Sequence, residues 1–410
     1  MRARRVRVPS LLGDMPGMGG APEPPPEEPV RRRFLFAVPP VAGNVGPAAA
    51  VAAELTARGH RVTWTGPKAR LEAVLPPGAR VLHADGVEPP AATHALRGPA
   101  ALRSLWEDVL VPLGHAMLPG VQAAIDRFRP DVVVSDQQIL AAPVAARLRG
   151  LPWATLAPTS AEFTRPLAAF PAVEGWVRDL IGDFQDEHGI EDLIDLRFSD
   201  HLVLVFSTGA LIGDVSFFPD HIAFVGPASH RALDTDFPWD ALDDDRPLVP
   251  IWLGSHGTAG EPGRRFLRAA VQAAAGLDAQ VVVAAPGKAL GAVPDGVVAR
   301  PRVPLAALLE RSAAFVTNGG HTAVGEALTH GVPMVVAPVR DDQPVVAGQI
   351  EAAGAGVRLR LGRVTADDIR DALFDVLSDD AYRTAAGTVR DAFAEAGGAG
   401  AAADRLEKLT

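Results

Sequence analysis

Short apolar segments alternate with segments of helical periodicity through most of the chain. In the first half the apolar segments are RFLFAVP, HRVTWTG, DVVVSD and LPWATLAP, and alanine-rich segments such as AAAVAAELTARG separate them. Short buried strands that alternate with amphipathic helices are typical of a parallel sheet covered by helices on both faces. The pattern therefore predicts an α/β fold.

The alternation lapses once, at residues 228–247, where proline and aspartate are frequent and no period is sustained. Such a segment is typical of a linker between domains, and it divides the folded part into residues 33–227 and 248–410. The alternation resumes as PLVPIWLG, AQVVVAAPG, AAFVTNGG and VPMVVAPV, and a helical tail follows from about residue 365. Two α/β halves predict two Rossmann-like domains that face each other across a cleft.

The first 32 residues differ from the rest. They end in APEPPPEEPVRR, whose prolines and charges prevent a packed core, so we expect a disordered leader or a segment foreign to the natural chain. Its basic start is followed by an apolar run that Asp14, Pro16 and several glycines interrupt, which argues against a secretory signal. We find no stretch of about 18 to 20 uncharged apolar residues, so we expect no membrane span. The prediction is a soluble protein, with the cytoplasm as default location.

The composition excludes some classes of function. The 410 residues carry a formal net charge of −10 and show no basic stripe, which argues against a nucleic-acid partner. The chain has no cysteine, so disulfides and cysteine-ligated metals are excluded. No metal-ligand spacing and no G-x-S-x-G motif occurs, which argues against a metalloprotease and a serine hydrolase.

The most informative motif is a glycine turn between a strand and a helix. The segment AAFVTNGGHTAVGEALTHG places Asn318, Gly319 and Gly320 after a strand, and the next helix begins near His321 or Thr322. Glycines let a ligand approach the backbone, and a helix N-terminus favours a phosphate there. The Thr322 hydroxyl could add a donor. A bare pair of glycines after a strand is more often a tight turn without a ligand, so the neighbours decide.

Polar residues around this turn favour a ligand. Glu326 lies one helical turn beyond Thr322, where a carboxylate can accept hydrogen bonds from ribose hydroxyls. The next strand ends before Asp342 and Gln343, a pair able to bind sugar hydroxyls at the edge of a sheet. A solvated acidic loop would explain Asp341 alone, but it explains the whole set poorly. The set favours a site that binds a phosphate together with ribose or sugar hydroxyls.

This segment resembles the donor-binding signature of the GT-B, UDP-glycosyltransferase-like family, of the bacterial natural-product type. The resemblance spans residues 33 to 408 and is strongest in the second half. It implies a GT-B fold whose C-terminal helix returns to the N-terminal domain, and transfer without a cofactor or a bound metal. It also implies that Gly254 and Ser255 lie near the diphosphate, that Arg302 stacks on the nucleobase and that the Val303 backbone binds the base edge.

The N-terminal loop PPVAGNVGP resembles the family's Pro-x-x-Gly-His-x-x-Pro loop, with one departure. In the family the loop histidine takes a proton from the acceptor hydroxyl, and an aspartate orients that histidine. Asn44 stands at the histidine position, and Asp136, at the end of DVVVSD, stands at the aspartate position. Asparagine has no titratable nitrogen and cannot be a general base, although it can hydrogen-bond an acceptor or Asp136.

The donor motif departs from the family as well. Asn318 stands where histidine is common, and Ala323 stands where a serine or threonine hydroxyl is usual, so we expect the phosphate contacts to depend on backbone N–H groups, Ser255 and Thr322. Beside a helix N-terminus His321 could donate to an anion, and a solvent-facing position is about as plausible. His115 belongs to a stretch that lines the acceptor cleft in the family.

The leading hypothesis is an inverting, metal-independent glycosyltransferase that moves a sugar from a UDP- or TDP-sugar to an apolar small molecule, such as a natural-product aglycone. The acceptor would lie under segments 90–120 and 155–200. Three accounts of the acceptor proton remain open. Asp136 could take it directly, the acceptor could need little base, or the chain could be a catalytically silent nucleotide-sugar-binding or auxiliary protein. The sugar, the acceptor and the oligomeric state are not readable from the sequence.

Overall fold

Each half of the chain forms one parallel β-sheet. The computed structural model describes residues 31–88, 90, 96, 98–168, 170–228, 236–254, 261–274, 277–286, 289–291, 293–294, 296–360 and 363–409. The first sheet has seven strands, β1 (Arg33–Ala37), β2 (Arg61–Gly66), β3 (Val81–His83), β4 (Val132–Asp136), β5 (Trp153–Ala157), β6 (Leu202–Val205) and β7 (Ile222–Phe224). The second has six, β8 (Leu248–Trp252), β9 (Gln280–Ala284), β10 (Val297–Arg300), β11 (Phe315–Thr317), β12 (Met334–Val336) and β13 (Gly356–Arg358).

The strand order of both sheets reverses once. The first sheet has the order β3-β2-β1-β4-β5-β6-β7, and the second has the order β10-β9-β8-β11-β12-β13. In each sheet the second and third strands are added on one side of the first strand, and all later strands are added on its other side. Both orders are those of a Rossmann-like doubly wound sheet, as the alternating pattern predicts. The reversal points lie between β1 and β4 and between β8 and β11.

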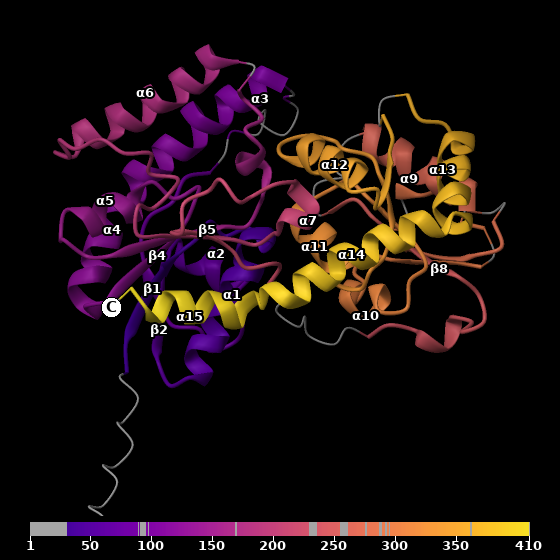
Figure 1. Ribbon diagram of the computed structural model, residues 1–410, viewed down its shortest axis with the longest axis horizontal. Helices are drawn as coiled ribbons and strands as arrows, with labels where there is room; N and C mark the ends of the chain where they lie inside the picture. Colours follow the sequence, from indigo (N-terminus) through magenta and orange to yellow (C-terminus); the bar gives the residue numbers. More distant parts are fainter. Residues whose placement is uncertain are drawn as a thin grey trace, which may run out of the picture. The chain divides into compact units, whose positions relative to one another are not determined.

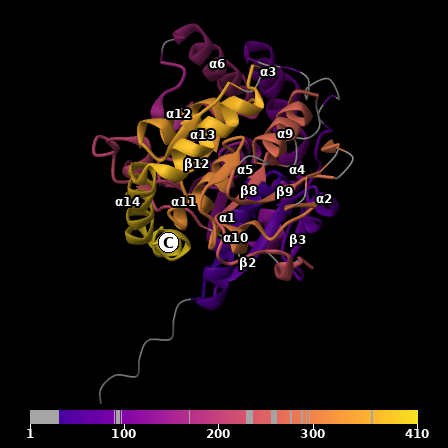
Figure 2. The same ribbon diagram turned by 90° about the vertical axis from the view of Figure 1, so that its right-hand side faces the viewer.

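Helices connect the strands (Figures 1 and 2). In the first half they are α1 (Ala42–Ala57), α2 (Lys68–Glu72), α3 (Gly98–Ser104), α4 (Val111–Phe128), α5 (Ala141–Arg147), α6 (Pro171–Glu187) and α7 (Gly209–Ile212). A π-helical turn, η2 (Leu105–Leu110), joins α3 to α4, and two 3₁₀ turns are η3 (Ala161–Thr164) and η4 (Trp239–Ala241). In the second half they are α9 (Glu261–Ala274), α10 (Leu305–Leu309), α11 (His321–Thr329), α12 (Gln343–Ala352), α13 (Ala366–Ser378), α14 (Asp380–Ala396) and α15 (Gly398–Glu407). Helix α7 packs against α12 and α14 of the second half.

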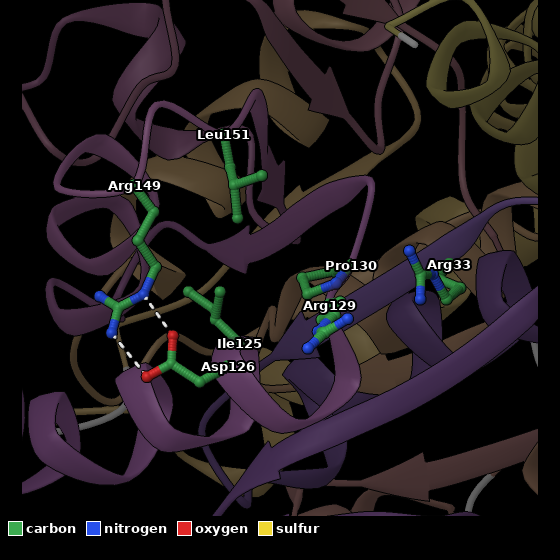
Figure 3. Close-up of a pocket in the computed structure, with 7 residues that line it drawn as sticks. All are labelled: Arg33, Ile125, Asp126, Arg129, Pro130, Arg149 and Leu151. Carbon is green, nitrogen blue, oxygen red and sulfur yellow. Dashed lines mark hydrogen bonds and ion pairs between the residues drawn. The ribbon is translucent and has the colours of Figure 1, made fainter.

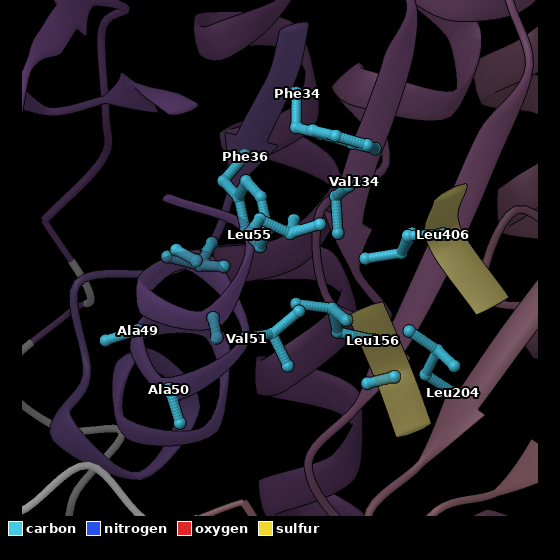
Figure 4. Close-up of a cluster of buried hydrophobic side chains, with 14 of the residues drawn as sticks. Phe34, Phe36, Ala49, Ala50, Val51, Leu55, Val134, Leu156, Leu204 and Leu406 are labelled. Carbon is cyan, nitrogen blue, oxygen red and sulfur yellow. The ribbon is translucent and has the colours of Figure 1, made fainter. Parts of the chain in front are cut away.

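Both faces of the first sheet are buried. Phe34 and Phe36 of β1 point into one apolar cluster with α1, whereas Leu35 and Ala37 point into a second cluster on the opposite face. Figure 4 shows the first cluster, in which Phe34 and Phe36 lie with residues of α1 and with Leu406 of α15. Because successive side chains of a strand point to opposite faces, burial on both faces requires a continuous apolar segment, which RFLFA supplies.

The last helix of the chain returns to the first domain. In Figure 1 the yellow helices α14 and α15 extend from the second sheet to α1. Arg58, which follows α1, bonds Asp404 at 2.6 Å and Glu407 at 2.9 Å, and His60 lies 2.7 Å from Glu407. The implied return of the C-terminal helix is therefore confirmed. At the point of return the Gly398 N–H donates to the carbonyl of Val225 over 2.7 Å, beside the segment that leaves the first sheet.

The domain boundaries inferred from the sequence stay a prediction. The connection between the sheets runs from Phe224 to Leu248, which contains the expected linker, and residues 229–235 lie outside the described part. Residues 1–30, which carry most of the expected leader, also lie outside it. From Arg32 onward the two sheets cluster as one compact unit.

One helical run departs from the sequence expectation. Gly98–Phe128 is long and apolar enough to cross a membrane by length and composition alone, and core helices of soluble proteins pass the same criterion. Several of its side chains, among them Trp106, Met117 and Val121, are buried in the second cluster of the first sheet. The expected absence of a membrane span stays a prediction.

The packing of α15 predicts a large loss of stability when Leu406 is truncated. Leu406 is fully buried, so Leu406→Ala should lower the free energy of unfolding by about 2–5 kcal/mol, because both apolar burial and close packing are lost. Urea unfolding followed by circular dichroism measures the change. Phe374→Ala is the matched control, because Phe374 on α13 is 62% exposed and its truncation should change little. Equal effects of the two substitutions would contradict the docking of α15.

Candidate functional site

Two candidate residues meet where the strand order of the first sheet reverses. Strands β1 and β4 are hydrogen-bonded neighbours, so the residues at their carboxyl ends lie side by side. Asn44 lies in the first turn of α1, which follows β1, and Asp136 is the last residue of β4. Asn44 Nδ2 donates to Asp136 Oδ2 over 3.0 Å. Ligands of doubly wound sheets bind outside such reversal points, so the pair occupies the expected place for acceptor chemistry.

The Asp136 carboxyl is almost fully enclosed, with 1% of its surface exposed. Its Oδ1 accepts from the Gln138 backbone N–H at 2.9 Å, while Oδ2 accepts from Asn44. Burial raises the pKa of Asp136 to about 6, and the two hydrogen bonds limit that rise. The carboxylate is therefore mainly ionised at neutral pH, but Asn44 covers one of its two oxygens.

The predicted donor loops meet at the reversal point of the second sheet. Gly254 follows β8 and Asn318 follows β11, and a Cβ on Gly254 would lie 3.4 Å from Asn318 Nδ2. Gly319 has a φ of +83°, and a Cβ there would lie only 2.9 Å from Cγ1 of Val336. The glycine is therefore required by both its backbone conformation and its close approach to β12.

The turn leaves the first N–H groups of α11 for an anion. The Gly319 N–H donates to Thr317 Oγ1, and the Gly320 N–H donates to Asn318 Oδ1, both over 3.3 Å. The first backbone bond within the helix runs from the Val324 N–H to the Gly320 carbonyl. The N–H groups before Val324 have no partner within the helix, as at any helix start. The phosphate site stays a prediction, and the donors that remain for it lie at the start of the helix and not at Gly319 and Gly320.

The structure places His321 differently from either interpretation of the sequence. Only 7% of its surface is exposed, so the solvent-facing position is wrong. Its Nε2 lies 3.0 Å from the hydroxyl of Ser160 in the first domain, and because that hydroxyl donates to Gln349, the ring donates to Ser160 through Nε2. Burial lowers the pKa of His321 to about 4, and the Pro158 carbonyl, which can accept a bond from the protonated ring, opposes that shift in part. A neutral ring held by the first domain does not support the expected bond to an anion.

Thr322 also contacts the first domain. Its hydroxyl donates to the Gly43 carbonyl over 3.0 Å, next to Asn44. A hydroxyl has one proton to donate, so the expected donation from Thr322 to a phosphate is not supported. The contact brings the start of α11 to the start of α1. The two reversal points therefore touch through Thr322 and Gly43.

The predicted sugar-binding residues lie on α11 and at the start of α12. Glu326 is one turn into α11, with His330 Nε2 3.6 Å from its Oε1. Asp342 immediately precedes α12, where burial raises the pKa of its carboxyl and the Thr159 hydroxyl of the first domain opposes that rise. Gln343 Oε1 accepts from the backbone N–H groups of Val339 and Arg340, which leaves its amide group to bind a ligand.

Four further candidates have less structural support. Arg302 is exposed and Val303 is partly buried in the loop after β10, where their roles toward a nucleobase stay predictions. Ser255 lies outside the described residues. His115 lies on α4, where its ring nitrogens contact His188 at 3.2 Å and Glu187 at 3.5 Å. These contacts place His115 against the C-terminal end of α6, and its role toward an acceptor stays a prediction.

Sequence reasoning missed the residues that join the two domains. The Ser160 hydroxyl donates to Gln349 Oε1 over 2.9 Å, and Gln349 Nε2 lies 3.5 Å from Thr164 Oγ1. Ser160 and Gln349 are buried, so these bonds are shielded from water. One signal could have found Ser160, because it follows β5 at the same sheet edge as Asp136.

A separate hollow lies at the amino ends of the central strands of the first sheet. It has a volume of about 450 Å³, and Arg33, Pro130 and Leu151, which line it, precede or begin strands β1, β4 and β5. Figure 3 shows Arg149 directed to Asp126 in this hollow, with hydrogen bonds of 2.9 and 3.0 Å. The hollow therefore lies at the amino ends of the strands, away from the edge that carries Asn44 and Asp136.

Comparisons with known proteins agree with this geometry. Residues 268–409 match the family described as Erythromycin biosynthesis protein CIII-like, C-terminal domain. Over 423 residues the chain is 30% identical to 4'-demethylrebeccamycin synthase from Lentzea aerocolonigenes, with 92% of this chain and 99% of that protein covered. The chain belongs to the bacterial natural-product glycosyltransferases.

Further similarities extend over the whole glycosyltransferase. It is 29% identical to demethyllactenocin mycarosyltransferase from Streptomyces fradiae, with 99% of this chain and 93% of that protein covered. Among solved structures, the glycotransferase of kitacinnamycin matches with a TM-score of 0.76 and 27% identity, over 93% of this chain and 100% of that one. The protein is an enzyme of the GT-B fold, so the fold and the enzyme class predicted from the sequence are confirmed.

The close contact at Gly319 predicts a loss of stability when this glycine is replaced by alanine. Gly319→Ala should lower the free energy of unfolding by about 2–4 kcal/mol, because it adds backbone strain and an overlap with Val336. Gly59→Ala is the matched control, since Gly59 has a φ of +91° and open space around a Cβ. Urea unfolding should show a loss of about 1–2 kcal/mol for the control. A Gly319→Ala loss no larger than that of the control would contradict the overlap.

The buried groups predict an altered pH dependence for Asp136→Asn. The pKa of Asp136 is raised on folding, so the folded state takes up this proton first. The contribution of Asp136 to the free energy of unfolding therefore rises as the pH falls through about 6. The pKa of His321 is lowered to about 4, so stability falls as the pH drops from the unfolded value of about 6.5. The two effects oppose each other in the wild type. Without Asp136, the free energy of unfolding should fall by about 2 kcal/mol more between pH 7 and pH 4.5.

Urea unfolding at the two pH values measures this difference. Asp278→Asn is the control, because the side chain of Asp278 is fully exposed and its loss should leave the wild-type pH dependence in place. Parallel pH profiles for the wild type and Asp136→Asn would refute the raised pKa.

Proposed function

We propose that this glycosyltransferase moves a sugar from a UDP- or TDP-sugar to an apolar small-molecule acceptor, with inversion at the anomeric carbon and without a bound metal ion. The hydrogen bond between Thr322 and Gly43 carries the proposal. It brings the start of α11, where the diphosphate would bind, next to Asn44, where the acceptor would bind. A nucleophile and a leaving group held on opposite sides of one carbon are the requirement for in-line displacement.

The donor side supplies neutral and dipolar groups to the diphosphate. The N–H groups at the start of α11 and the helix dipole would stabilise the negative charge that develops on the leaving group. In the described part of the chain, no group of three or more His, Asp or Glu side chains could hold a metal ion. Glu326, Asp342 and the Gln343 amide group would bind the hydroxyls of the ribose and the sugar.

The acceptor side favours a nucleophile that loses its proton readily. Asn44 cannot keep a proton, because its amide is not basic. Asp136 is 1% exposed and already accepts two hydrogen bonds, so an acceptor could reach it only if Asn44 moved. With Nδ2 directed to Asp136, Asn44 Oδ1 can accept a hydrogen bond from the acceptor. We therefore favour amines, carboxylic acids and acidic phenols over simple alcohols.

Donor and acceptor panels test the proposal directly. The enzyme would be incubated with UDP- and TDP-sugars and with apolar alcohols, phenols and amines, in buffer with and without EDTA. Mass spectrometry should detect transfer that EDTA leaves unchanged, and NMR should show the inverted anomeric configuration. Donor binding without transfer or donor hydrolysis on any acceptor would favour the silent nucleotide-sugar-binding alternative.

Two substitutions test the origin of the proton acceptor. Asp136→Asn should lower kcat for an acidic phenol by less than about tenfold, because a general base typically contributes a factor of about 10² to 10⁴ and none is proposed here. A loss in that larger range, with nucleotide binding unchanged, would identify Asp136 as the base. Asn44→His should create activity on alcohols, because a histidine at this position could take their proton and bond Asp136.

A further inference from the structure

Ser160 of the first domain bonds two helices of the second domain at once. Its hydroxyl lies 3.0 Å from Nε2 of His321, the first residue of α11, and 2.9 Å from Oε1 of Gln349 on α12. Ser160 follows β5, and all three side chains belong to residues that are less than 10% exposed. One buried hydroxyl therefore connects the acceptor domain to both helices whose first residues are proposed donor contacts.

The hydrogen bonds around Ser160 run in one direction. The Thr164 hydroxyl donates to the Ala161 carbonyl over 2.9 Å, so Thr164 accepts from Gln349 Nε2 at 3.5 Å. This contact orients the Gln349 amide with Oε1 toward Ser160, whose hydroxyl donates to it. The single hydroxyl proton of Ser160 is then used, so Ser160 accepts from the Nε2–H of His321. Removal of Ser160 or Gln349 would break this chain between the domains.

Apolar contacts also connect the two domains. Leu211 of α7 is buried in a cluster with residues of α11 and α12, and Leu406 of α15 is buried in a cluster of the first sheet. Apolar contacts are non-directional and tolerate small shifts, whereas a hydrogen bond weakens steeply when its angle changes. The bonds of Ser160 therefore restrict the relative orientation of the two domains more narrowly than the apolar contacts do.

This orientation matters for transfer, because the two reactants would bind to different domains. The donor diphosphate would lie at the start of α11, and the acceptor would lie beside Asn44. A displacement of about 1 Å between reacting groups can lower a rate by about 10²-fold. Without the Ser160 hydroxyl, Gln349 Oε1 and His321 Nε2 would be buried without that partner, whereas rotation of the domains could expose them to water. Loss of the hydroxyl should therefore favour orientations in which the reactants are not aligned.

We propose that Ser160 is a positioning residue for sugar transfer, whose hydroxyl holds α11 and α12 in the orientation that aligns the donor with the acceptor. The inference rests on the proposed function, because it requires the diphosphate at the start of α11 and the acceptor next to Asn44. Ser160 acts through His321 and Gln349 and contacts neither reactant. Its loss should therefore lower the rate of transfer and leave nucleotide binding intact.

Kinetics and binding of full-length variants test the inference. Ser160→Ala removes the hydroxyl, and Gln349→Leu removes its acceptor in the second domain. Ser199→Ala is the matched control, because the Ser199 hydroxyl is also buried and bonds the Trp153 carbonyl at 2.6 Å and the His201 N–H at 3.0 Å, all within the first domain. The kcat at saturating donor and acceptor is divided by the fraction of protein that binds UDP or TDP in isothermal titration, so unfolded protein does not contribute.

The expected result is a loss of kcat without a loss of nucleotide affinity. Ser160→Ala and Gln349→Leu should each lower kcat about 10- to 100-fold and leave the Kd for UDP or TDP within about twofold. The double variant should be no slower than the slower single variant, because both substitutions break the same chain. Ser199→Ala should keep the wild-type kcat. If Ser160→Ala did not fold, Gln349→Leu would test the same chain from the second domain.

Other results would overturn the inference. An unchanged kcat in Ser160→Ala would show that its hydroxyl does not align the reactants, and an equal loss in Ser199→Ala would mean that both hydroxyls only support the fold. A rise in the Kd for UDP or TDP as large as the loss of kcat would assign the effect to nucleotide binding. If the wild type bound nucleotide sugars but transferred to no acceptor, the proposed function itself would be wrong, and the inference would fall with it.

Discussion

The reversal of strand order in two parallel sheets is the constraint on which the site depends. At a reversal the connections from two adjacent strands leave toward opposite faces, so their loops diverge and open a crevice at the carboxyl edge. In the first sheet this crevice lies between Asn44 and Asp136, and in the second it lies between Gly254 and Asn318. The residues to which we assign acceptor or diphosphate chemistry lie at these two positions.

Buried polar contacts connect the two crevices. His321, Ser160 and Gln349 are each less than 10% exposed and form one hydrogen-bonded chain, while Thr322 bonds the backbone beside Asn44. Hydrogen bonds away from water are costly to break without replacement. The helix that would bind the diphosphate is therefore coupled to the loop that would bind the acceptor. His321 and Thr322, which the sequence analysis considered as anion contacts, instead form the contacts between the two domains.

The sequence was most informative where structure is local. Continuous apolar segments such as RFLFA predict buried parallel strands, and the Asn318-Gly319-Gly320 turn predicts a helix start, because both depend on neighbours in the chain. The pairing of Asn44 with Asp136 followed from the family resemblance, which supplied the relative position of two segments 92 residues apart. No such guide existed for His321 and Ser160, which lie 161 positions apart. Their contact depends on how two finished domains approach each other, and a one-dimensional pattern does not contain that information.

The chain passes between the domains twice at almost the same place. It leaves the first sheet after Val225 and returns at Gly398, and a hydrogen bond of 2.7 Å joins the two crossings. Two domains that are joined by two adjacent chain crossings can rotate about those crossings, but the crossings oppose their separation or sliding. We expect the opening that admits donor and acceptor to be such a rotation, with the Thr322 to Gly43 contact on its path. The C-terminal helix would thereby form part of the hinge, although it lies at the opposite end of the folded chain from the acceptor loop.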